Sequence, residues 1–219
     1  MAADTDATAR QLTPRGVVFL MVMQNAAFCA LGVLLWHWSG REPVEMVDWA
    51  SPLGWLGGIA LGLAFIAVAW GVCRAFPHMS DRFAEWQANT YRGFGRDLGW
   101  PAIVTVAFAA GIGEEVLLRG GLQTWLTDHV GPMWAILLAS AAFAALHLAR
   151  PIVTALLFVI GIVFGWIYWA TDSLLMVMLA HAIYDVWAIR TLLRQLDRLG
   201  LFEAKEEPGA ALVNGPEPG

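Results

Sequence analysis

Apolar runs long enough to cross a membrane are the feature that most limits how this chain can fold. A helix rises about 1.5 Å per residue, so about 20 apolar residues cross a hydrocarbon core of roughly 30 Å. Such runs lie at 16–38, 53–73, 101–127, 133–148, 152–170 and 174–189. We therefore expect an all-α fold, a polytopic membrane helix bundle of about six transmembrane helices with additional interfacial amphipathic helices.

The composition agrees with a membrane protein and excludes an ordinary soluble domain. Only 14% of the residues are charged and 58% are hydrophobic, whereas about a quarter of a soluble domain is charged. Many of the 12 tryptophans stand near the ends of the apolar runs, as in the aromatic belts at membrane interfaces. Cys29 and Cys73 fall inside apolar runs, which argues against a disulfide or a zinc–thiolate site. Nothing indicates a nucleic-acid surface.

The domain organisation follows from these runs. We expect a transmembrane domain at 16–190, with the chemistry in a core at about 97–190. We expect the polar segments 1–15 and 205–219 to be disordered. Between the transmembrane domain and the C-terminal polar segment, we expect an amphipathic surface helix at 191–204 that faces anionic lipid. Its evidence is apolar residues at helical spacing and a stripe formed by Arg190, Arg194 and Arg198.

Two further expectations concern the loops. Ser80 and Asp81 form a suitable N-cap for a short amphipathic helix that Gly93 ends, which we place at the membrane interface. Lys and Arg concentrate in alternate loops, and with both termini cytoplasmic the opposite side carries only Arg41 and Arg119. The short loops favour a bacterial inner (plasma) membrane.

Ionisable residues inside apolar spans are functional candidates, because a buried charge is costly unless it is paired or used. Glu114 and His147 each lie about 16 residues, or roughly 24 Å of helix, from the turn near residue 131, so a helical hairpin would bring them to one level. Glu115 and Arg119 share a helix face at i, i+4, as do His181 and Asp185. We expect Arg119 to neutralise Glu115 and to leave Glu114 free.

Taken in order, Glu114-Glu115-x-x-x-Arg119, Phe143-x-x-x-His147 and His181-x-x-x-Asp185 resemble the three motifs of the CAAX protease and bacteriocin-processing family, which includes the type II CAAX prenyl endopeptidases. The resemblance implies an intramembrane glutamic-type endopeptidase. Glu114 would then be the general base and His147 would hold the water. His181 and Asp185 would stabilise the oxyanion, with Glu115, Arg119 and Phe143 as structural support. Asp185 departs from the asparagine of the eukaryotic-type members and donates a hydrogen bond only when protonated.

Three functional readings stay open at this point. The first is a hydrolase without a cofactor that cleaves near the C-terminus of a lipidated or membrane-anchored protein or peptide, or of one with a C-terminal sorting signal. The second is a zinc metalloprotease with Glu114, His147, His181 and Asp185 as ligands or base, although no His-Glu-x-x-His is present. The third is a non-catalytic bacteriocin-immunity or peptide-binding membrane protein.

Overall fold

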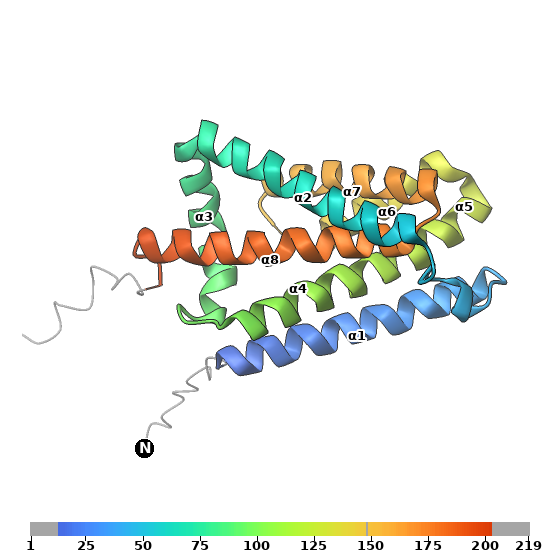
Figure 1. The fold of residues 1–219 in the computed structure, drawn as a ribbon, viewed down its shortest axis with the longest axis horizontal. Coiled ribbons are helices and arrows are strands. Elements are labelled where there is room, and N and C mark those ends of the chain that lie inside the picture. The colour runs from blue at the N-terminus through green and yellow to red at the C-terminus, as the bar shows by residue number, and fades with distance from the viewer. Residues whose placement is uncertain (1–12, 148, 203–219) are drawn as a thin grey trace, which may run out of the picture.

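The structure, a computed structural model, describes residues 13–147 and 149–202 and is helical across them, without strands (Figure 1). The long helices are α1 (Pro14–Trp38), α2 (Pro52–Ala75), α3 (Pro77–Tyr91), α4 (Trp100–Glu115), α5 (Thr124–Val130), α6 (Pro132–Leu146), α7 (Pro151–Thr171) and α8 (Leu174–Arg198). Short turns η1 (Pro43–Glu45) and η2 (Arg92–Phe94) lie in the loops, and a π-helical segment η3 (Val116–Gln123) joins α4 to α5. The predicted all-α membrane bundle is confirmed. The predicted disordered tails lie almost wholly outside the described residues.

Five helical stretches are long and apolar enough to span a membrane, which makes the chain an integral membrane protein. They are α1, α2, the continuous helix Trp100–Val130, α7 and α8. The sixth apolar helix, α6, has only 15 residues, fewer than the roughly 20 that a full crossing needs. Only 11% of the apolar window of α1 and of α2 is buried, against 56% for Trp100–Val130. The helix that carries the glutamates is therefore central, and α1 and α2 expose apolar side chains of the kind that face lipid.

Prolines set where most of these helices begin. A proline stands at the first or second position of α1, α2, α3, α4, α6 and α7, where its missing N–H costs nothing. The N-cap predicted at Ser80 is wrong for this reason, because α3 already begins at Pro77 and Ser80 lies buried inside it. The hydroxyls of Thr13, Ser51 and Ser173 cap α1, α2 and α8.

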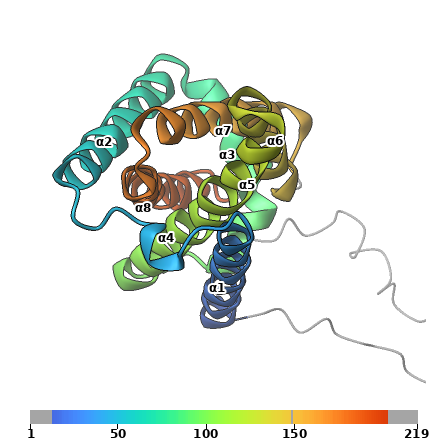
Figure 2. The same ribbon diagram turned by 90° about the vertical axis from the view of Figure 1, so that its right-hand side faces the viewer.

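Helix α8 runs through the middle of the molecule, between α2 on one side and α4 on the other (Figures 1 and 2). As the glycines of α2 predict, α2 approaches α8 closely: a Cβ at Gly58 would lie 2.9 Å from the carbonyl oxygen of Met176. Residues 191–198, predicted as part of a surface helix, continue α8 without a break. Leu192 and Leu196 there are buried with Ala84 and Ala88 of α3, so this end of α8 packs against protein on one face.

Candidate active site

The ionisable residues meet where α4 and α8 pack most closely. A Cβ at Gly111 would lie 2.6 Å from the backbone nitrogen of Ala182, so the two backbones are nearly in contact just before Glu114 and just after His181. Because each helix brings its polar residues to this crossing, Glu114 and Glu115 at the end of α4 face His181 and Asp185 on α8.

Glu115 accepts two hydrogen bonds that join the two motifs. Its Oε1 lies 3.1 Å from a guanidinium nitrogen of Arg119 and 2.8 Å from Nδ1 of His181. The side chains of Glu115 and Arg119 are each only 1% exposed, so this is a buried ion pair. Since a carboxylate can only accept, the bond requires a proton on Nδ1 of His181. That arrangement directs Nε2 of His181 toward the other carboxylates.

Arg119 is held from several sides. In addition to Glu115, its guanidinium donates to the carbonyl oxygen of Gly161 over 3.1 Å. Its central carbon lies 5.0 Å from the ring centre of Phe143 and 5.8 Å from that of Phe164, which are cation–π distances. Phe143, only 4% exposed, therefore packs on the arginine as well as on the histidine rings.

Glu114 is the carboxylate without a fixed role in packing. Its Oε2 lies 4.0 Å from Nε2 of His181, and Oδ2 of Asp185 lies 3.5 Å from the same nitrogen. Within residues 13–147 and 149–202, the buried Oε2 of Glu114 has no hydrogen-bond partner. Its side chain is 15% exposed. A polar atom in this position requires a partner such as water or a substrate group.

His147 lies at the edge of this group. It follows α6 directly and is exposed. One ring nitrogen, Nδ1, is 2.8 Å from the carbonyl oxygen of Phe143, and the two rings are 4.7 Å apart. His147 interacts electrostatically with Glu114, but no hydrogen bond joins the two among the described side chains. The hairpin thus brings His147 near Glu114 and leaves it on the accessible side.

Sequence reasoning missed four features of the site. The segment η3 that carries Arg119 is π-helical, a form frequent at functional sites. The adjacent Gly120 and Gly121, which disfavour a regular helix, were the available signal. The link from Glu115 to His181 and the contact of the Phe164 ring with His181 at 5.7 Å depend on how helices pack, and no local pattern marks them.

Tyr91, at the end of α3, is the fourth missed feature, because its phenol interacts electrostatically with Asp185 and Glu114. Burial raises the pKa of the Tyr91 phenol above its usual range, and the two carboxylates raise it further. The phenol therefore stays protonated at physiological pH and remains a hydrogen-bond donor at this end of the site.

The residues of the predicted zinc alternative do not form a ligand set as they are arranged. In the described part of the chain, no three His, Cys, Asp or Glu side chains are placed to hold one metal ion. Nδ1 of His181 is engaged by Glu115, and His147 forms its hydrogen bond with the Phe143 carbonyl oxygen and none with Glu114 among the described residues.

Comparison with protein families matches residues 96–187, somewhat less than half of the chain, to the family described as Rce1-like type II CAAX prenyl endopeptidases. This segment contains all three motifs, and the match confirms the resemblance predicted from them. No curated protein matches the chain. No solved structure matches it.

Proposed function

We propose that this protein is an intramembrane endopeptidase that hydrolyses a peptide bond near the C-terminus of a lipidated or membrane-anchored protein or peptide, with Glu114 activating the water. The family match supports a CAAX-type protease. The observation that carries the finer proposal is the difference between the two glutamates. Through Oε1, Glu115 is hydrogen-bonded to both Arg119 and His181, and only its Oε2 lacks a partner among the described residues. Glu114 has no such bond: its Oε2 is also unpartnered among the described residues and lies 4.0 Å from Nε2 of His181.

The chemistry follows from these positions. A water between Glu114 and the substrate gives a proton to the Glu114 carboxylate, and its oxygen bonds to the carbonyl carbon. The carbonyl electrons move to the oxygen, where His181, as an imidazolium with protons on both ring nitrogens, can donate through Nε2–H and Asp185 can donate in its protonated form. Glu114 then returns the proton to the leaving nitrogen as the C–N bond breaks. Glu115 acts as a positioning residue, since it holds the imidazole of His181.

His147 has a separate role in this proposal. Because His147 is exposed and lies near Glu114, its ring can hold or polarise the attacking water. No hydrogen bond to the Glu114 carboxylate fixes that ring among the described residues. Arg119 and Phe143 support the site: the arginine balances the charge of Glu115, and the ring packs against both Arg119 and His181.

For the setting of the reaction, we propose a bacterial inner membrane with both termini cytoplasmic. The distribution of basic residues supports this orientation: Arg92 and Arg96 lie before the start of α4 and Arg198 ends α8 at one end of the bundle, while Arg41 lies in the loop after α1 at the other end (Figure 1). The positive-inside rule assigns the arginine-rich end to the cytoplasm. Insertion of a cysteine in each end, followed by labelling with a membrane-impermeant reagent, tests the assignment.

Substrate trapping tests the proposed function. The Glu114→Ala variant is expressed in cells, purified with bound peptides, and analysed by mass spectrometry for C-terminal fragments of membrane proteins. We expect intact C-terminal segments on the variant and cleaved products with the wild type. Glu85→Ala, at an acidic position of α3 outside the site, is the matched control and should behave as wild type.

The outcomes also separate the other readings. If Glu114→Gln retains full cleavage of the captured peptides, Glu114 is not the base and the proposal is wrong. If neither wild type nor variant cleaves a peptide that both bind, the protein is a peptide-binding membrane protein and not a peptidase.

A further inference from the structure

A cavity of about 350 Å³ lies on the far side of α8 from the proposed active site. Arg190 follows His181 by nine residues, and Arg194 follows Asp185 by nine. Nine residues are about two and a half helical turns, which places the arginines on the opposite face of α8 from the histidine and aspartate. A peptide bound at the active site would have to wrap around α8 to reach this cavity.

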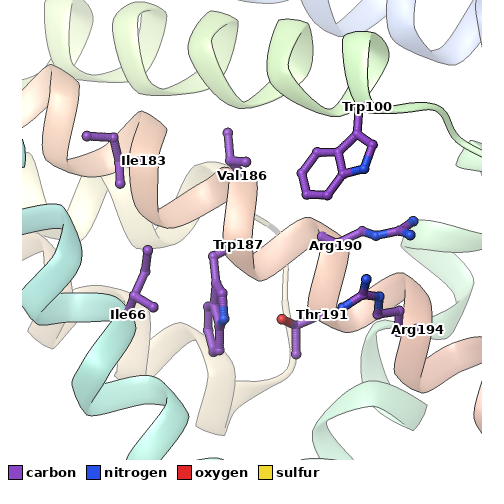
Figure 3. Close-up of a pocket in the computed structure, with 8 residues that line it drawn as sticks. All are labelled: Ile66, Trp100, Ile183, Val186, Trp187, Arg190, Thr191 and Arg194. Atoms are coloured by element: carbon purple, nitrogen blue, oxygen red, sulfur yellow. The ribbon is translucent and has the colours of Figure 1, made fainter.

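The cavity has one basic end and one apolar end. Figure 3 shows the guanidinium groups of Arg190 and Arg194 together at one end, with Ile66 and Ile183 at the other. Eleven residues separate Ile183 from Arg194 on α8, a distance of about 16 Å along the helix. A lining of this length, basic at one end and apolar at the other, suits an amphiphile with an anionic head.

Within 13–147 and 149–202, no carboxylate forms an ion pair with Arg190 or Arg194 at the basic end. Arg190 lies over the ring of Trp100, 5.3 Å from its centre, and its buried Nε has no hydrogen-bond partner in the described residues. No acidic side chain lines the cavity. Farther along the same helix, Asp197 pairs with Arg96 and Arg198 pairs with Asp81. Arg190 and Arg194 thus differ from Arg198, their neighbour on α8, which has a carboxylate partner.

The position of the cavity suits a membrane lipid. It lies at the end of the bundle where α4 begins at Trp100 and where α8 approaches its end, and tryptophan and arginine at a span end are typical of the headgroup region. Its other wall is α2, whose apolar surface is largely exposed. An acyl chain that leaves the cavity past Ile66 would therefore continue along an apolar surface.

We propose that this cavity, formed by α2, α4 and α8, binds the headgroup of one anionic phospholipid. The phosphate would accept hydrogen bonds from Arg190 and Arg194, and the first part of one acyl chain would lie along Ile66, Ile183 and Trp187. The arginine stripe predicted to face anionic lipid from a surface helix thus acts, in part, through a defined site. This inference is independent of the proposed peptidase activity.

Native mass spectrometry of the full chain tests the proposal. The protein is purified in detergent that contains equal amounts of dioleoyl phosphatidylglycerol and dioleoyl phosphatidylcholine, and the ratio of the two one-lipid complexes is measured. We expect the anionic lipid to predominate. Arginines near an anionic surface contribute about fivefold each, so Arg190→Gln with Arg194→Gln should lower the ratio about 25-fold. Arg82→Gln, an exposed arginine of α3, should leave it unchanged.

A second variant tests the cavity without changing the arginines and includes a check that the protein is folded. Ile66→Trp fills the apolar end and keeps both arginines, and it should reduce retention of the anionic lipid while circular dichroism shows wild-type helix content. An unchanged lipid ratio in the double arginine variant would overturn the proposal. So would displacement of phosphatidylglycerol by a hydrophobic peptide with a free C-terminal carboxylate but not by its amide, because the occupant would then be a peptide.

Discussion

The same substitution at two neighbouring residues, Glu114→Gln and Glu115→Gln, should have very different effects on stability. Glu115 balances the charge of Arg119, which is 1% exposed, and accepts from His181. Removing one partner of a buried ion pair costs about 3–5 kcal/mol. Oε2 of Glu114 has no hydrogen-bond partner among the described residues, so its neutralisation should change the free energy of unfolding by about 1 kcal/mol or less.

Thermal unfolding in detergent, followed by tryptophan fluorescence, measures the difference. In a chain of this length, 1 kcal/mol shifts the Tm by about 2–4 °C, so Glu115→Gln should lower the Tm by about 6–20 °C. Glu114→Gln should remain within about 4 °C of the wild type. Equal shifts for the two variants, or a larger one for Glu114→Gln, would refute the assignment of Glu115 to the buried network.

Three further predictions concern helix packing, capping and metal dependence. Gly113→Ala should lower the free energy of unfolding by about 1–3 kcal/mol, because the new Cβ would lie 2.6 Å from Oδ1 of Asn25. Gly71→Ala, whose Cβ would have nothing within 4 Å, should not destabilise the protein. Thermal unfolding of the two variants checks the difference. Asp48→Ala should lower the free energy of unfolding by about 1–2 kcal/mol, because the Asp48 carboxylate accepts a hydrogen bond from Ser173 and holds the start of α8. It should also slow cleavage. Thermal unfolding and cleavage rates measure the two effects. Treatment with a zinc chelator should leave cleavage unchanged, whereas loss of activity with rescue by zinc and one bound metal per chain would favour the metalloprotease reading.

Much of the fold could be predicted because hydrophobic runs, prolines and glycines act locally. The first five apolar runs located their helices to within about three residues, whereas the sixth was predicted to end at 189 and α8 continues to Arg198. The glycines of α2 indicated that a neighbouring helix packs closely, and that helix is α8. Two errors have local causes. Pro77 starts α3 before the predicted cap at Ser80, and α6, predicted as a transmembrane span, has only 15 residues between Pro132 and Leu146, fewer than a full crossing needs.

The sequence indicated which ionisable residues lie near one another, but not how they are connected. Spacing at i, i+4 indicated that Arg119 can reach Glu115, and the ion pair forms. That Glu115 also binds His181 depends on the rotation of α8 about its axis relative to α4, which no single helix encodes. The same holds for Tyr91, which reaches the neighbourhood of Asp185 only because α3 folds back against α8.

The rate of cleavage by Glu114→Gln is the most direct test of the central claim. With a peptide captured by the trapping variant as substrate, wild type, Glu114→Gln and Glu85→Gln are compared at equal concentration in the same vesicles. Loss of a general base lowers the rate by about 10²–10⁴-fold, so we predict a decrease of this size for Glu114→Gln and none for Glu85→Gln. Cleavage by Glu114→Gln at the wild-type rate would contradict the account.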